Sequence, residues 1–310
     1  VVRWIPFGGY CMMLGDESFV QDPSLLGEKV DIDEEHAYSK KSVWARMAIT
    51  LAGPVFNFLL ALLFSVILVA LIGSADTKIS GVVEGYPAEE AGLQEGDEIL
   101  KLNNTRVHIF SDISIYMLLH EGEPIEITYK RDGEKLKTTI IPKQGENGYM
   151  IGIYAPQREK SSNPLKVFRS AFYEFKYNTG AVFKSLGLLF TGKAGLNDLS
   201  GPVGMAGMVN DIVNEVEEDT KEESGWVTAY WIFINLLSFT ALISANLGIM
   251  NLLPVPGLDG GKMLFLLVEA VIRKPVPKKM EGIITIAGFV LLAALMIIVF
   301  FNDIRKVFFL

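Results

Sequence analysis

The sequence of 310 residues has one cysteine, three histidines and fewer basic than acidic residues. A single cysteine, Cys11, excludes an internal disulfide, so cysteine content does not indicate a redox compartment. Lys and Arg number 28 against 36 Asp and Glu, which gives a formal net charge of −8. Because no basic stripe is available to neutralise phosphates, this charge balance argues against a nucleic-acid partner.

The histidines do not form the pattern of a helical zinc site. Such a site has two His residues four positions apart on one helix face, with a Glu beside the first. His36, His108 and His120 stand alone, without a Glu and a second His at that spacing. We expect all three to be ordinary exposed or partly packed side chains.

The first residue also lacks the features of a natural start. The chain begins with Val1 rather than Met, and no signal peptide with a basic start and a small-residue cleavage site precedes the first apolar run. We expect the natural N-terminus to lie upstream of Val1.

Long uncharged runs account for the character of the chain. The mean hydropathy is +0.33, and 50% of the residues are hydrophobic. Three runs without a charged residue cover 47–75, 224–258 and 282–302, and each reaches the ~20 residues that a bilayer-spanning helix needs. The sequence predicts a multi-pass α-helical membrane protein, with a transmembrane helix over 47–75, a transmembrane segment over 226–272 and a third helix over 282–302.

Basic residues near these runs indicate their orientation. Lys40, Lys41 and Arg46 precede the first run and Asp76 follows it, and loops rich in Lys and Arg stay in the cytoplasm. The polar stretch 15–46 is therefore predicted to be a cytoplasmic loop, and the region after the first run extracytoplasmic. A second basic group returns the chain to the cytoplasm: Lys262, Arg273, Lys274, Lys278 and Lys279.

The region after the first run has soluble character, with short apolar runs between charged turns. Its stretch Pro87-Ala-Glu-Glu-Ala-Gly-Leu-Gln-Glu-Gly-Asp-Glu-Ile99 resembles the Pro-Ala-x-x-Ala-Gly-Leu-x-x-Gly-Asp-x-Ile stretch of bacterial PDZ domains. A helix is expected over 111–120, and a hairpin over 125–141 that turns at Asp132-Gly133. We therefore predict an inserted α+β PDZ domain over 79–156.

The resemblance to PDZ domains implies a peptide groove. In circularly permuted domains of this type, peptide binds between the last strand and the helix. A groove that takes a peptide terminus and an empty groove that acts as a steric gate both fit the sequence. The residues that would line it are Ile115, Ile151, Gly152 and Ile153.

An amphipathic pattern follows the predicted PDZ domain. Apolar residues recur at three- and four-residue intervals from Leu165 to Leu189, with Lys and Arg between them. We predict an extracytoplasmic amphipathic helical region over 160–223, which packs on the PDZ domain or lies on the membrane surface.

One carboxylate stands at the membrane end of the second run. Asp259 belongs to the stretch Asn251-Leu-Leu-Pro-Val-Pro-Gly-Leu-Asp-Gly-Gly261. An acid at this depth is costly and requires a pairing partner, an ion or water. The prolines and glycines around it prevent a continuous helix, and irregular backbone within a membrane is tolerated only where protein or a cavity satisfies its polar groups. We interpret this segment as a functional site.

The pattern Asn-x-x-Pro-x-Pro-x-Leu-Asp-Gly-Gly resembles the motif of the site-2 proteases, which are intramembrane zinc metalloproteases. In that family the Asp is the third zinc ligand, and the other two are histidines of a His-Glu-x-x-His helix whose Glu is the general base. The resemblance implies that Asp259 binds Zn²⁺ and that Asn251, Pro254 and Pro256 help to hold substrate extended, or only shape the turn that presents Asp259. Because this chain lacks His-Glu-x-x-His, the catalytic residues are expected upstream of Val1.

Other stretches resemble the same family in the same order. Residues 1–14 resemble a membrane-dipping β-hairpin that offers an edge strand to unwound substrate, although a purely structural hairpin also fits. Its candidate substrate-binding residues are Gly8, Gly9 and Tyr10. Ala52-Gly53-Pro54 with Asn57 and Leu199-Ser-Gly-Pro-Val-Gly204 also match, where helix packing and a plain turn are the simpler explanations. A fourth span, lost before Val1, would complete the family's common plan.

The resemblance implies regulated intramembrane proteolysis in a bacterial cytoplasmic membrane. Substrates would be single-span membrane proteins, such as anti-sigma factors already shortened by another protease, or remnant signal peptides. The other partners would be the lipid bilayer and a peptide terminus in the PDZ groove. We expect this chain to be an N-terminally truncated form that is inactive alone. A non-catalytic membrane PDZ adaptor or inactive homologue would also explain the missing histidines. An ion or solute carrier would use the acid as a coupling site, although a second broken segment is lacking.

Overall fold

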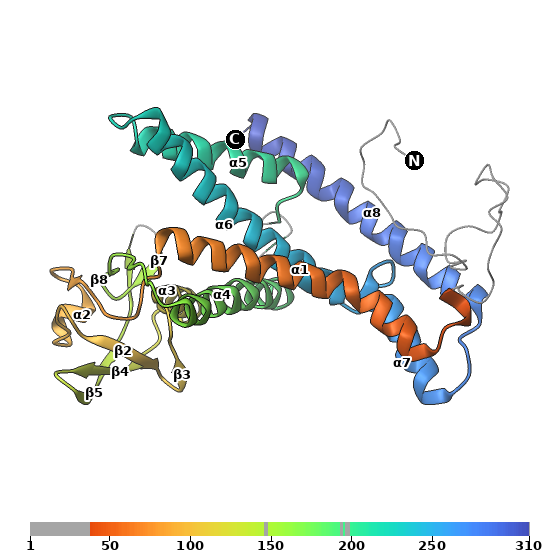
Figure 1. Cartoon of the computed structure of the whole chain (residues 1–310), viewed down its shortest axis with the longest axis horizontal. Coiled ribbons are helices and arrows are strands. Elements are labelled where there is room, and N and C mark those ends of the chain that lie inside the picture. Colours follow the sequence, from red (N-terminus) through yellow and green to blue (C-terminus); the bar gives the residue numbers. More distant parts are fainter. Residues whose placement is uncertain (1–37, 146–147, 193–194, 196–198, 310) are drawn as a thin grey trace. The chain divides into compact units, whose positions relative to one another are not determined.

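The computed structural model describes residues 38–145, 148–192, 195 and 199–309 (Figure 1). The predicted hairpin over 1–14, with Gly8, Gly9 and Tyr10, lies outside the described residues. The chain forms two compact units. The first contains the described residues within Val1–Asn57, Leu196–Gly207 and Leu247–Leu310, and the second contains those within Phe58–Gly195 and Met208–Asn246.

Among the described residues, three helices are long and apolar enough to cross a membrane: α1 (Val43–Ile72), α6 (Gly225–Leu252) and α8 (Lys278–Phe309). They coincide with the three uncharged runs of the sequence, so the prediction of three membrane-compatible helices is confirmed. Two of these helices include charged residues outside the uncharged runs: α1 contains Arg46 and α8 contains Asp303.

The predicted segment 226–272 consists of two helices. The first, α6, ends at Leu252, and α7 (Asp259–Ile272) begins after a turn over residues 253–258. Pro254 and Pro256 lack the backbone N–H that a helix interior needs, and Gly257 has a φ of +96°. The break therefore lies where the sequence predicts that a continuous helix cannot form.

The residues from Ile79 to Tyr154, called the sheet domain below, form the core of the second unit. Its main sheet is antiparallel with the order β3-β2-β4-β5, and the strands are β2 (Glu98–Leu102), β3 (Thr105–Arg106), β4 (Ile125–Arg131) and β5 (Glu134–Ile140). The predicted hairpin is present, because Ile125 pairs with Ile140 and Arg131 pairs with Glu134 across the Asp132-Gly133 turn.

Two short ladders and two helices complete the sheet domain. β1 (Gly81–Val82) pairs with β8 (Ile153–Tyr154), and β6 (Lys143–Gly145) pairs with β7 (Gly148–Met150). The helices are α2 (Pro87–Glu90) and α3 (Phe110–Leu119). Apolar residues of the sheet and helices form one buried cluster, whose fully buried members include Ile79, Ile99, Leu102, Ile125 and Ile127.

Two chain segments join the sheet domain to the helices, and they are hydrogen-bonded to each other. The backbone N–H of Ser74 donates to the carbonyl oxygen of Glu159 at 3.2 Å, and the reverse bond measures 3.1 Å. The N–H of Ser80 donates to the carbonyl oxygen of Tyr154 at 3.2 Å. The segments 74–80 and 154–159, together called the paired neck below, therefore attach the sheet domain as one hydrogen-bonded pair rather than as two independent linkers.

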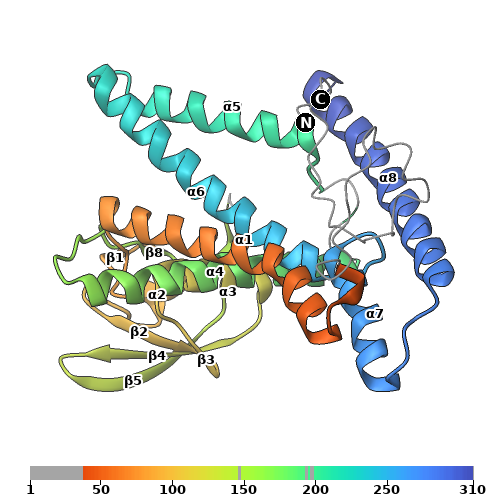
Figure 2. The same cartoon turned by 45° about the vertical axis from the view of Figure 1, so that its right-hand side comes forward.

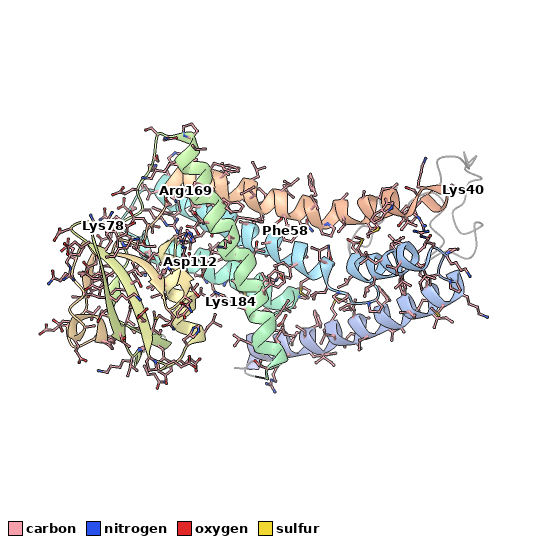
Figure 3. All side chains as sticks on the ribbon, turned by 90° about the horizontal axis from the view of Figure 1, so that it is seen from below. Lys40, Phe58, Lys78, Asp112, Arg169 and Lys184 are labelled. Carbon is pink, nitrogen blue, oxygen red and sulfur yellow. The ribbon has the colours of Figure 1, made fainter. Side chains whose placement is uncertain are left out.

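Helix α4 (Pro164–Phe190) packs on both the sheet domain and α1 within the second unit. Phe175 meets Phe58 of α1 edge-on at 6.2 Å between ring centroids, and Tyr173 stacks on His108 at 4.1 Å. Figure 3 shows α4 between the sheet domain, where Asp112 is labelled, and α1, where Phe58 is labelled. Burial in this contact lowers the pKa of His108. The predicted amphipathic region thus contains α4, which packs on the sheet domain, and a second helix, α5 (Pro202–Asp219).

Candidate active site

Asp259 is the first residue of α7, directly after the turn over residues 253–258. Its carboxylate is half-buried, and a negative charge is favourable at a helix N-terminus. No hydrogen bond or salt bridge joins this carboxylate to another residue in the part of the chain that the structure describes. Lys262, one turn further along α7, is a positive charge that acts on this carboxylate. An acid at the end of an apolar segment is a candidate ligand for an ion.

The glycines after Asp259 are required by close backbone contacts. A Cβ added to Gly260 would lie 2.2 Å from the carbonyl oxygen of Leu253, and one added to Gly261 would lie 2.4 Å from that of Val255. On the opposite side of the turn, a Cβ on Gly288 of α8 would lie 2.1 Å from the carbonyl oxygen of Pro256. The turn that presents Asp259 is therefore held between the start of α7 and α8, and three glycines make the space for it.

A fourth glycine, Gly53, lets α1 approach the Asp259 carboxylate closely. A Cβ added to Gly53 would lie 3.4 Å from Oδ2 of Asp259. Pro54, the next residue, is fully buried. The Ala52-Gly53-Pro54 stretch thus belongs to the surroundings of Asp259, where the sequence suggested helix packing alone.

Helices α1 and α7 face each other through matching stripes. Gly53 lies beside Asp259 at one end, and Arg46 pairs with Glu269 at the other, so the two helices run in opposite directions side by side. Figures 1 and 2 both show α7 beside the first turns of α1. The residues of the two stripes recur at three- and four-residue intervals, as one helix face requires: Arg46, Thr50, Gly53 and Asn57 on α1, and Asp259, Lys262, Leu266 and Glu269 on α7.

Polar contacts along its length hold this helix pair together. An Nη atom of Arg46 donates to Oε1 of Glu269, and both side chains are mostly buried. The ring of Tyr38 lies 4.9 Å from the Lys262 ammonium, and its hydroxyl lies 3.3 Å from the hydroxyl of Thr50. These contacts fix how far α7 is displaced along α1, and hence where Asp259 lies beside Gly53.

Breaking the Arg46–Glu269 pair should destabilise the protein through one uncompensated buried charge. We expect Arg46→Met or Glu269→Leu alone to lower the free energy of unfolding by roughly 3 kcal/mol. The double variant should recover most of that loss, because it buries no unpaired charge. Unfolding in mixed detergent micelles measures all three variants.

The exposed pair Lys137–Glu126, whose side chains are 63% and 47% exposed, provides the control. Glu126→Gln should change the free energy of unfolding by less than about 1 kcal/mol. Single variants of Arg46 and Glu269 that unfold like Glu126→Gln would show that the buried pair does not set the α1–α7 contact.

The other predicted site residues lie at varied depths. Asn251 is in the last turn of α6 and half-buried, Pro254 is exposed and Pro256 is half-buried. The predicted groove residues of the sheet domain include one core member, because Ile151 is 2% exposed. A Cβ added to Gly152 would lie 2.1 Å from Cβ of the Tyr86 side chain, Ile153 pairs with Val82, and Ile115 is half-buried on α3.

Asp259 can supply one ligand to a metal, and its Oδ2 atom lies beside Gly53 of α1. Across residues 38–145, 148–192, 195 and 199–309, no three His, Cys, Asp or Glu side chains stand together as a metal site would require. His108 and His120 both belong to the sheet domain, in contact with Tyr173 and Tyr116 respectively. The described residues therefore fit one position of a metal site and leave the other ligands to be supplied from elsewhere.

Comparisons with known proteins place these features among peptidases. The family model described as Peptidase family M50 matches residues 1–295. A protein of Clostridium acetobutylicum is 34% identical over 305 residues, which cover 98% of this chain and 81% of that protein. The zinc metalloprotease RasP of Geobacillus kaustophilus is 37% identical over 278 residues, which cover 87% of this chain and 61% of that protein.

One solved structure that matches is the PDZ domain of an SdrC-like protein from Listeria monocytogenes. It covers 27% of this chain and 86% of that structure, with 21% identity and a TM-score of 0.24.

Proposed function

This chain belongs to peptidase family M50, and from that premise we propose that it acts in a membrane zinc metalloprotease with Asp259 as one of the zinc ligands. The observation that carries the proposal is the placement of Asp259 at the start of α7, beside Gly53 of α1 and without a salt bridge among the described residues. Zinc at such a site polarises a carbonyl group and lowers the pKa of bound water to about 7. The name of RasP as a zinc metalloprotease supports the choice of metal.

The described residues of this chain would bind the metal and position the substrate. Asp259 would bind the metal, Gly53 would leave room for its carboxylate, and the glycines at 260, 261 and 288 would keep the turn compact. Asn251 and Pro254, in and after the last turn of α6, would help to hold an extended substrate. The two histidine ligands and the general base would come from outside the described residues.

The substrates that fit this site are single-span membrane proteins, of the anti-sigma factor or remnant signal peptide type. A transmembrane helix hides its peptide carbonyls in backbone hydrogen bonds, so it must unwind before hydrolysis. The basic residues before α1 and after α7 support an orientation with the sheet domain outside the bacterial cytoplasmic membrane. In that position the sheet domain would exclude substrates that still carry a bulky outer domain.

The paired neck allows the sheet domain to be removed, which tests whether this domain excludes substrates with a bulky outer domain. Because the N–H of Ser80 donates to the carbonyl oxygen of Tyr154 at 3.2 Å, residues 81–153 can be removed and Ser80 joined to Tyr154 through a short glycine linker. The Ser74–Glu159 pairing stays in the shortened protein. We expect the full-length enzyme with this deletion to cleave unshortened single-span substrates, and to cleave shortened ones as before.

The same deletion combined with Asp259→Asn serves as the control, and it should cleave neither substrate. Both cleavage rates would be measured with purified enzyme and substrate in proteoliposomes. A deletion variant that still discriminates against unshortened substrates would remove the sheet domain from substrate selection.

A further inference from the structure

A second carboxylate lies fully buried in the first unit, on the helix α8. Three positions of α8 are buried among those the structure describes: Gly288, Val299 and Asp303. Their spacings of eleven and four residues place them on one narrow face of the helix. Asp303 is 1% exposed, and an ionised group in an apolar spanning helix is costly unless specific partners satisfy it.

The partners of Asp303 are backbone N–H groups at the start of α5. Its Oδ2 atom accepts from the N–H of Gly201 at 2.9 Å and from that of Gly204 at 2.8 Å. Since α5 begins at Pro202, these donors belong to the helix N-terminus, where N–H groups lack partners within the helix. An N-cap side chain normally fills this role, but Gly201 has none. The cap of α5 therefore comes from a different helix.

The two glycines are spaced to admit this carboxylate. A Cβ on Gly201 would lie 2.9 Å from Oδ2 of Asp303 and 3.0 Å from Cγ1 of Val299, and a Cβ on Gly204 would lie 2.9 Å from Oδ1. Neither glycine has a positive φ, so their backbone conformation is open to other residues. The Gly-Pro-Val-Gly pattern is thus explained by space for Asp303.

The same face of α8 also contacts the turn before Asp259. Gly288 is in backbone contact with Pro256, and Cδ1 of Leu292 approaches Gly257. Gly288 and Asp303 are fifteen residues apart on one unbroken helix, which corresponds to a rise of about 22 Å. A helix held at these two places transmits a displacement at one of them to the other.

We propose that Asp303 is a positioning residue that ties the Leu199–Gly204 turn to α8 and so holds α8 against the Pro256 turn that presents Asp259. This proposal rests on the proposed metalloprotease function for its consequence in catalysis. The tie itself is a structural property that can be measured without activity.

The test distinguishes two roles of Asp303: linking the Leu199–Gly204 turn to α8, and capping the N-terminus of α5. Asp303→Ala removes both, whereas Asp303→Ala combined with Gly201→Asp gives α5 a cap of its own without a link to α8. The parent and every variant carry Val299→Ala, because Cγ1 of Val299 would otherwise lie 3.0 Å from the new Cβ at position 201. A single reporter cysteine at Leu292, in full-length protein whose other cysteines, including Cys11, are changed to Ser, measures how closely α8 contacts the turn. Ile297→Ala, which changes a 54% exposed side chain of the same helix, is the control.

We expect both Asp303 variants to increase the rate of maleimide labelling at the reporter several-fold and to reduce cleavage roughly tenfold or more. Zinc should be retained, because Asp259 is unchanged. The double variant should regain thermal stability. Its labelling should remain fast, and its cleavage should remain reduced. Ile297→Ala should resemble the parent in every measurement.

Slow labelling and full cleavage in the double variant would overturn the proposal, because Asp303 would then act only as a cap. Unchanged labelling in Asp303→Ala would overturn it as well. If Asp303→Ala does not fold, Gly204→Ala displaces the same carboxylate and is judged by the same criteria. A parent protein that neither binds zinc nor cleaves would contradict the proposed function, while the labelling rates would still decide whether Asp303 ties α8 to the turn.

Discussion

Replacing Asp259 with asparagine is expected to abolish cleavage of a single-span substrate by the full-length protein. Asparagine has nearly the same shape but no charge, so the fold around Gly53 should persist while the metal loses an anionic ligand. Groups that only orient a ligand contribute 10–100-fold to metal affinity or activity, and the loss of a direct ligand should exceed roughly a hundredfold. Cleavage rates of purified variants in detergent measure the effect.

Asp211 offers a matched control for this prediction. It is an exposed residue of α5, and Asp211→Asn makes the same chemical change away from α7. That variant should cleave at the parental rate. Parental activity in Asp259→Asn would exclude Asp259 from the reaction.

Gly260→Ala is expected to inactivate the enzyme by opening the turn. The added methyl group would lie 2.2 Å from the carbonyl oxygen of Leu253 and 2.4 Å from that of Leu252. Both contacts are with backbone, so α7 must shift, and Asp259 at its first position shifts with it. Overpacking of this kind lowers the free energy of unfolding by roughly 1–3 kcal/mol, and the displacement of Asp259 should reduce activity further.

Gly282→Ala is the matched control for the turn. Nothing lies within 4 Å of a Cβ at this position in α8, and alanine in a helix interior is favoured over glycine by up to about 1 kcal/mol. The same substitution is therefore expected to stabilise the protein at 282 and to destabilise it at 260. Thermal unfolding and cleavage assays on Gly260→Ala and Gly282→Ala measure this difference. Equal effects of the two substitutions would contradict the claim that the turn before Asp259 has no room for a methyl group.

Much of the architecture could be predicted because it depends on local pattern. Uncharged runs predict α1, α6 and α8, and the Pro and Gly residues after Leu252 predict the break before α7. The Asp132-Gly133 turn between alternating strands predicts the β4–β5 hairpin. In each case the signal and the structure that it produces lie within a few tens of residues.

The contacts that place the site could not be predicted in this way. In the sequence Arg46 indicates only the orientation of the first span, yet it pairs with Glu269, which is 223 residues away. Asp303 directly follows the uncharged run 282–302, and nothing in the sequence around it indicates that it is buried. A usable signal was present in the Arg46, Thr50, Gly53 and Asn57 stripe, where polar and small residues recur on one face of an apolar helix. The partner helix of that stripe is set by tertiary packing, which periodicity does not reveal.

The burial of Ile151 is a second feature that the sequence does not reveal. The resemblance to PDZ domains assigns this residue to a peptide groove, and the structure places it between β7 and β8. At 2% exposure, its side chain contributes to the buried cluster of the sheet domain. The assignment of Ile115, Ile151, Gly152 and Ile153 to a groove stays a prediction.

The zinc content of the purified full-length protein tests the central claim most directly. The parent and Asp259→Asn would be dialysed against a weak chelator, and bound zinc would be measured by elemental analysis. The account predicts near-stoichiometric zinc in the parent and little in the variant, with unchanged thermal unfolding of the sheet domain in both. Equal zinc in the two proteins would show that Asp259 is not a ligand, and the proposed site at the start of α7 would have to be abandoned.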